Sequence, residues 1–86
     1  MSMEKKEKAL FELSLGETGI VSDITSDIGM RRRFMDIGCM VGSDIKKLGV
    51  GPFGDPSAYL ICGAVIAIRK KDAATIRVVA SESQNS

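Results

Sequence analysis

The sequence contains no histidine and no tryptophan, and its only aromatic residues are one tyrosine and three phenylalanines. Without an imidazole, neither a Ser/His nor a Cys/His nucleophile pair can form, and no side chain titrates near neutral pH without help from its surroundings. The glycines form no GxxxxGK[ST] or GxGxxG run, which argues against a cradle for nucleotide phosphates. The sequence therefore predicts a binding module rather than an enzyme, with no catalytic or cofactor-binding residues.

The sequence also lacks an excess of charge of either sign and any long apolar run. Twelve Lys and Arg residues and eleven Asp and Glu residues give a net charge of +1. The overall charge therefore does not attract phosphates or an anionic membrane surface. The longest apolar stretch, Tyr59–Ile68, is far shorter than the about 20 residues of a membrane-spanning helix. The charged start, Met1–Lys8, lacks the apolar segment of a secretory signal. We therefore expect a cytoplasmic protein.

The chain divides into a charged N-terminal lead-in (1–8), one folded unit (9–80) and a polar C-terminal tail (81–86). Within the folded unit, apolar side chains at Met30, Phe34 and Ile37 predict one buried face of a short helix over 28–38, with Gly38 as its left-handed stop. A further helical turn is expected at 71–74. Strands are expected at 20–25, 44–50, 57–62, 64–69 and 75–79.

Strands this short in so small a chain cannot form two stacked sheets of normal size. The pattern therefore predicts a mainly β fold, in which a small antiparallel sheet curls into a partly open β-barrel with one short α-helix.

The order of several short motifs is more specific than the composition. Leu15-Gly16-Glu17-Thr18-Gly19, a helix ending in Met35-Asp36-Ile37-Gly38, the loop Pro52-Phe53-Gly54-Asp55-Pro56 and the strand Ile76-Arg77-Val78 follow one another along the chain. Together they resemble the ferrous iron transport protein A (FeoA) family over Leu13–Val79. Two positions depart from the family pattern, since Val41 stands where proline is usual and Cys39 where leucine is usual.

The resemblance implies an SH3-like barrel in the bacterial cytoplasm. It also implies a non-enzymatic adaptor that associates with FeoB, the membrane transporter for ferrous iron, and modulates its assembly or its GTPase activity. The same fold occurs as the C-terminal domain of metal-responsive repressors, so a metal-binding or metal-sensing domain is one alternative interpretation. A small-barrel nucleic-acid-binding domain that uses the arginines of the helix is the other.

The strand over 57–62 carries the first candidate partner surface. If Ser57, Tyr59 and Ile61 point inward, then four apolar side chains point outward: Ala58, Leu60, Cys62 and Val65. A solvated face of an antiparallel strand should carry polar residues. Either the N-terminal segment or a shifted register covers these side chains, or they form a patch that meets a partner or a second copy of the chain.

Two other segments are candidates. Arg31, Arg32 and Arg33 form either a solvated helix face, a basic edge that meets a partner, or a phosphate-binding surface. Stacking aromatics are too scarce to favour nucleic acid. The loop over 49–56 is either a simple turn or a recognition loop with Phe53 as its exposed anchor.

The two cysteines are the only thiol ligands for a metal. With Asp36, Asp44 or Asp55, Cys39 and Cys62 could hold a divalent cation, but buried cysteines more often act as small apolar residues. We therefore expect no metal site.

Overall fold

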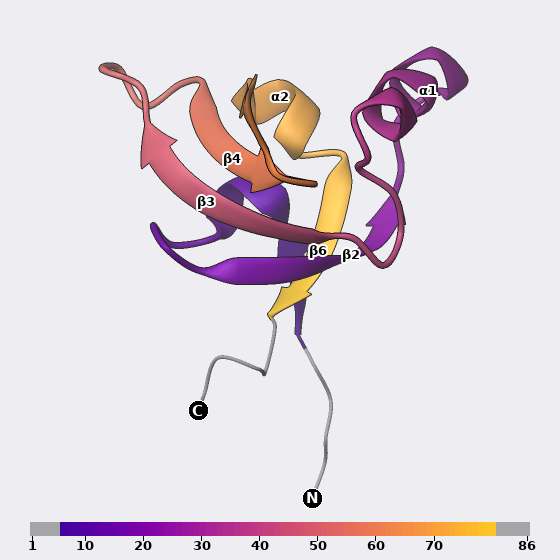
Figure 1. The fold of residues 1–86 in the computed structure, drawn as a ribbon, viewed down its shortest axis with the longest axis horizontal. Helices are drawn as coiled ribbons and strands as arrows, with labels where there is room; N and C mark the ends of the chain where they lie inside the picture. The colour runs from indigo at the N-terminus through magenta and orange to yellow at the C-terminus, as the bar shows by residue number, and fades with distance from the viewer. Residues whose placement is uncertain (1–5, 81–86) are drawn as a thin grey trace, which may run out of the picture.

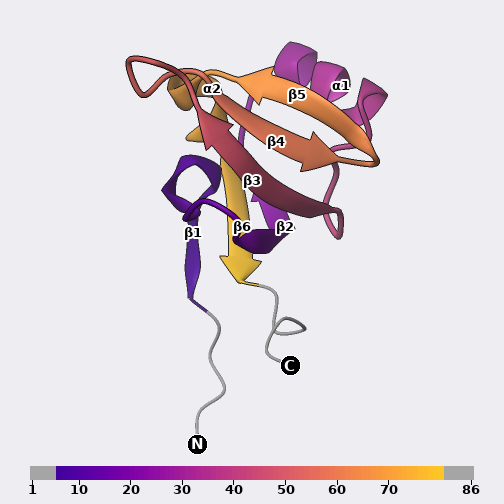
Figure 2. The ribbon, with the colours of Figure 1, turned by 60° about the vertical axis from the view of Figure 1, so that its left-hand side comes forward.

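The computed structural model describes residues 6–80, which fold into one curved antiparallel sheet with two helices at the same end of it (Figures 1 and 2). The sheet has six strands in the order β1-β6-β2-β3-β4-β5. β1 and β5 are therefore its two edges. The elements are β1 (Glu7–Ala9), the 3-10 helix η1 (Leu10–Glu12), β2 (Thr18–Ile24), α1 (Ile28–Asp36), β3 (Asp44–Val50), β4 (Ser57–Ile61), β5 (Ala64–Ile68), α2 (Lys70–Ala73) and β6 (Ile76–Ala80).

The predicted mainly β fold with one short helix is confirmed. α1 begins at Ile28 as expected and ends at Asp36, and Gly38 adopts a φ of 88°. The backbone N–H of Cys39 donates to the Phe34 carbonyl over 2.8 Å, which closes the end of the helix. The expected strands over 44–50, 57–62 and 64–69 agree with β3, β4 and β5 to within one residue.

One strand was not predicted. β1 begins at Glu7, inside the segment expected to be a lead-in, and pairs with β6 through Glu7 opposite Val79 and Ala9 opposite Arg77. The Ser22 hydroxyl donates to the Glu7 carboxylate over 2.6 Å. Glu-Lys-Ala has no intrinsic preference for a strand, so its conformation comes from the partner strand rather than from its own residue types.

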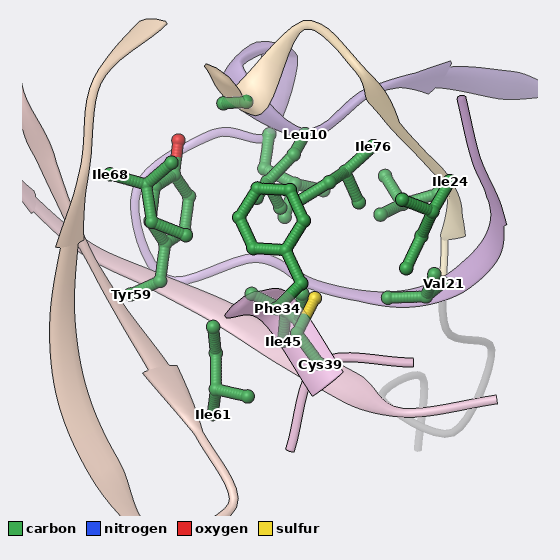
Figure 3. Close-up of a cluster of buried hydrophobic side chains, with 13 residues drawn as sticks. Leu10, Val21, Ile24, Phe34, Cys39, Ile45, Tyr59, Ile61, Ile68 and Ile76 are labelled. Carbon is green, nitrogen blue, oxygen red and sulfur yellow. The ribbon is translucent and has the colours of Figure 1, made fainter. Parts of the chain in front are cut away.

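The core lies between the sheet and the two helices (Figure 3). Tyr59 and Ile61 are fully buried and Ser57 is nearly so, which confirms that this face of β4 points inward. Phe34 enters the same core from α1, with Met30 and Ile37 packed against it as half-buried neighbours. The predicted buried face of the helix is therefore correct, and α1 is anchored mainly by one aromatic side chain. No helix within residues 6–80 has both the length and the apolar character that crossing a bilayer requires.

Candidate partner-binding surface

The outer face of β4 and β5 carries the apolar side chains expected there. Leu60 lies opposite Val65, and Ala58 lies opposite Ala67, so the cross-strand neighbours between β4 and β5 are apolar, whereas Leu60 lies opposite Lys46 on the β3 side. Val65 is 66% exposed, whereas Ala58 and Leu60 are half-buried. The N-terminal strand β1 lies at the opposite edge of the sheet, so the described residues do not cover this face with the N-terminal segment. We call Ala58, Leu60, Val65 and Ala67 the outer patch.

Cys62 lies in the two-residue turn that joins β4 to β5. Cys62 and Gly63 have φ values of 51° and 80°, as a tight hairpin turn requires at both central positions. The Cys62 thiol is 3.7 Å from the Gly38 carbonyl oxygen. The tip of the hairpin therefore contacts the chain directly after α1, and this contact sets where α1 lies relative to β5.

α1 presents its three arginines to solvent. The Asp27 side chain accepts a hydrogen bond from the Met30 backbone N–H over 3.0 Å and caps the start of the helix. Arg31, Arg32 and Arg33 are all exposed, and the ion pairs found within residues 6–80 involve none of them. The helix therefore offers a free basic surface.

A groove of about 520 Å³ separates α1 from β5. Its apolar walls come from Met30, Phe34 and Ile37 of α1 and from Ile66, Ala67 and Ile68 of β5. Four charged residues line the same groove: Arg33, Asp36, Arg69 and Asp72. Arg33 thus lies on one side of β5 and the outer patch lies on the other, with Ala67 bordering both. The sequence did not reveal this groove, because its two walls are far apart in the chain.

Phe53 lies apart from these residues. It is 94% exposed in the loop between β3 and β4, which Gly51 closes by donating its backbone N–H to the Pro56 carbonyl over 2.9 Å. This loop precedes β4, whereas Cys62 follows it, so Phe53 and Cys62 lie at opposite ends of that strand. Leu60 and Val65 are therefore cross-strand neighbours, Arg33 lies in the groove beside β5, and Leu60 and Cys62 share a different depression. Phe53 is a separate exposed anchor, whose role stays a prediction.

The cysteines and carboxylates do not assemble into a metal centre within residues 6–80, where no group of three His, Cys, Asp or Glu side chains lies close enough to hold an ion. Asp55 accepts a hydrogen bond from the Lys70 backbone N–H over 2.7 Å, at the start of α2. Asp44 and Cys62 line a smaller depression with Thr18 and Lys46. Asp36, Asp44 and Asp55, which could have bound a metal with the cysteines, therefore lie in three different parts of the fold.

Two buried groups have perturbed acidity. Burial, followed by the neighbouring Cys62, raises the pKa of the Cys39 thiol to about 11, so Cys39 is not a reactive thiolate near neutral pH. Burial also raises the pKa of Tyr59, while the nearby Ser57 hydroxyl acts in the opposite direction. The Tyr59 hydroxyl nevertheless has no partner in hydrogen-bond geometry among the described residues. Both groups belong to the core rather than to a reactive site.

Solved structures similar to this chain include FeoA proteins and a further class. A FeoA-like protein from Clostridium acetobutylicum is 33% identical, with 88% of this chain and 87% of that chain covered and a TM-score of 0.77. The FeoA protein of Stenotrophomonas maltophilia complexed with zinc, an SH3 domain protein, is 23% identical over 87% and 91% of the two chains, with a TM-score of 0.69.

The further class is a manganese-dependent transcriptional repressor in complex with manganese. It is 26% identical, with 94% of this chain and 40% of that chain covered and a TM-score of 0.81. The likeness to these structures confirms the predicted SH3-like fold.

Comparison with curated proteins yields no match. The FeoA domain, in contrast, matches residues 8–80, which is nearly the whole of the part that the structure describes. That range includes both walls of the groove, the outer patch and the three arginines of α1. The chain belongs to the FeoA domain family.

Proposed function

We propose that this protein acts in ferrous iron transport as a non-enzymatic cytoplasmic adaptor that associates with the cytoplasmic part of a FeoB-like membrane transporter. The observation that carries the proposal is the match of residues 8–80 to the FeoA domain. A small barrel says nothing by itself about what it binds, so the choice of partner follows from the family and not from the fold.

The surface around β5 supports a binding role. An exposed valine, an apolar strand face and a groove with two arginines lie side by side, and exposed apolar patches of this kind mark interaction sites in soluble proteins. Docking here would place Arg31, Arg32 and Arg33 near the partner. Such a complex could influence either the assembly of the transporter or its GTP hydrolysis, because an arginine supplied in trans can stabilise charge on a transferring phosphoryl group.

A metal-sensing domain is the second candidate, favoured by the likeness to the manganese-dependent repressor. The absence of a three-ligand cluster within residues 6–80 gives it less support. Nucleic-acid binding through the arginines of α1 has less still, because the net charge is +1 and the one aromatic side chain of the groove, Phe34, is buried and so not available for a base to stack on.

Co-purification tests the adaptor proposal. Tagged protein is recovered from gently solubilised membranes of its own cells, and the co-eluting proteins are identified by mass spectrometry. We expect a GTPase-containing membrane transporter with the parent protein and its loss with Leu60→Asp, because the new carboxylate interrupts the outer patch. Leu15→Asp is the matched control, since Leu15 is 62% exposed and precedes β2. Recovery of no membrane protein with the parent would refute the proposal.

A further inference from the structure

β5 is an unprotected edge of the sheet. A two-residue turn makes Ile61 and Ala64 a hydrogen-bonded pair, and such pairs alternate along an antiparallel ladder. The backbone N–H and C=O groups of Val65 and Ala67 therefore point away from β4. Among the described residues, no hydrogen bond uses these groups, and β5 is the last strand of the sheet.

No residue of β5 hinders pairing with an additional strand. Natural proteins usually guard an edge strand with lysine, proline or a bulge. Ala-Val-Ile-Ala-Ile contains no charge and no proline, and its register with β4 is regular from end to end. Val65 is 66% exposed on this edge. The strand thus has the properties of a template for another strand.

The groove between α1 and β5 gives an added strand a second wall. Side chains of such a strand alternate between two faces. On one face they would lie beside Ile66 and meet Met30 and Ile37 of α1, and on the other they would lie beside Val65 on the outer patch. Both faces offer apolar contact, so an added segment would gain side-chain contacts as well as backbone hydrogen bonds.

The charges that border the groove favour an acidic occupant. The segments 27–37 and 69–73, which form its helical borders, carry six of the chain's twelve basic residues and only three acidic ones. Arg33 and Arg69 line the groove directly, as do Asp36 and Asp72, so the positive excess comes from the neighbouring Arg31, Arg32, Lys70 and Lys71. Pairing of β5 with a second copy of itself would bring together two uncharged strands and leave these arginines without partners.

We propose that β5 is a receptor for an extended segment of another protein, with alternating apolar and acidic residues, which joins the sheet by strand addition between β5 and α1. This goes beyond the proposed function, because it does not depend on which protein supplies the segment. The backbone groups of Val65 and Ala67 provide the affinity, and the apolar walls and Arg33 select the sequence.

Nuclear magnetic resonance with a synthetic peptide tests the proposal. The probe is a capped octapeptide of alternating valine and glutamate, added to the isotope-labelled full chain. We expect the largest amide shifts at Val65, Ile66 and Ala67, and a slowing of amide hydrogen exchange at Val65 and Ala67 by about tenfold or more at saturation. The matching octapeptide of valine and lysine should bind at least about tenfold more weakly at low salt.

Substitutions at Val65 separate the backbone from the side chain. Val65→Pro removes one outward N–H at a position where an edge strand tolerates proline, and it should abolish peptide binding. Val65→Thr keeps the N–H and the branched shape, and it should bind within about twofold of the parent. Val65→Asp, which leaves the backbone intact, places a carboxylate beside the valines that the peptide presents to the outer patch and should also weaken binding, so the proposal stays testable if the proline variant does not fold.

Three results would overturn the proposal: no saturable binding at millimolar peptide, equal binding of the lysine peptide, or undiminished binding to a folded Val65→Pro. No transporter takes part in this assay, so its failure is distinct from a failure of the adaptor proposal.

Discussion

Replacement of Gly38 by alanine should destabilise the protein through two separate costs. Gly38 has a φ of 88°, and an L-residue in this left-handed region costs about 1–2 kcal/mol. An added Cβ would also collide with the Cys62 Sγ and lie 3.1 Å from the Cys62 Cβ, and overpacking of this kind costs about 1–3 kcal/mol. The expected total is about 2–5 kcal/mol, a large part of the about 4–13 kcal/mol expected for a chain of this length.

Gly42 provides the matched control. Its φ is 97°, but no atom lies within 4 Å of an added Cβ, so Gly42→Ala should cost only the conformational term of about 1–2 kcal/mol. Urea denaturation followed by circular dichroism measures both variants. In a Cys62→Gly background the collision disappears, and Gly38→Ala should then cost no more than Gly42→Ala. An equal cost of Gly38→Ala in both backgrounds would refute the view that Cys62 positions the end of α1.

Three further predictions concern buried or capping groups. Tyr59→Phe removes a buried hydroxyl that has no hydrogen-bond partner and should raise the free energy of unfolding by about 1 kcal/mol, and a clear loss would show that the hydroxyl is satisfied. The pKa of Cys39 is raised to about 11 from 9.0. The contribution of the neutral Cys39 thiol to the free energy of unfolding is therefore complete below pH 9 and is lost as the pH rises through 11. Denaturation across this range should show a loss of about 2–3 kcal/mol that Cys39→Ala makes smaller, and an unchanged pH profile would contradict the assignment. Asp27→Ala removes the cap of α1 and should cost about 1 kcal/mol in the same urea assay, with no cost as the contrary result.

Local sequence patterns were sufficient to predict most of the fold. Period-two alternation over 57–61 correctly placed Tyr59 and Ile61 inside, and the spacing of Met30, Phe34 and Ile37 correctly gave the inner face of α1. Gly38 ended the helix because only a residue without a Cβ avoids both the conformational cost and the Cys62 thiol. The alternation, the helix spacing and the conformational preference of glycine depend on residues close in sequence, which is why the sequence alone could predict them, whereas the contact of Gly38 with Cys62 could not be predicted in this way.

Features that depend on distant residues could not be predicted. β1 forms because it pairs with β6, and no residue of Glu7–Ala9 favours a strand by itself. The outward direction of the Val65 side chain was predicted, but not that β5 would lie at the edge of the sheet. The groove exists because Phe34 and the contact between Cys62 and Gly38 hold α1 beside β5, and both contacts join segments far apart in the chain.

Uptake of ferrous iron by living cells tests the central claim most directly. In cells whose own gene is replaced by a variant, radioactive ferrous iron uptake is compared for the parent protein, Val65→Asp and Leu15→Asp, each at equal protein level. We predict that Val65→Asp lowers uptake to the level of a deletion, because the proposed partner surface is the exposed edge at β5, and that Leu15→Asp retains it. Full uptake with Val65→Asp, or with the gene deleted, would contradict the account.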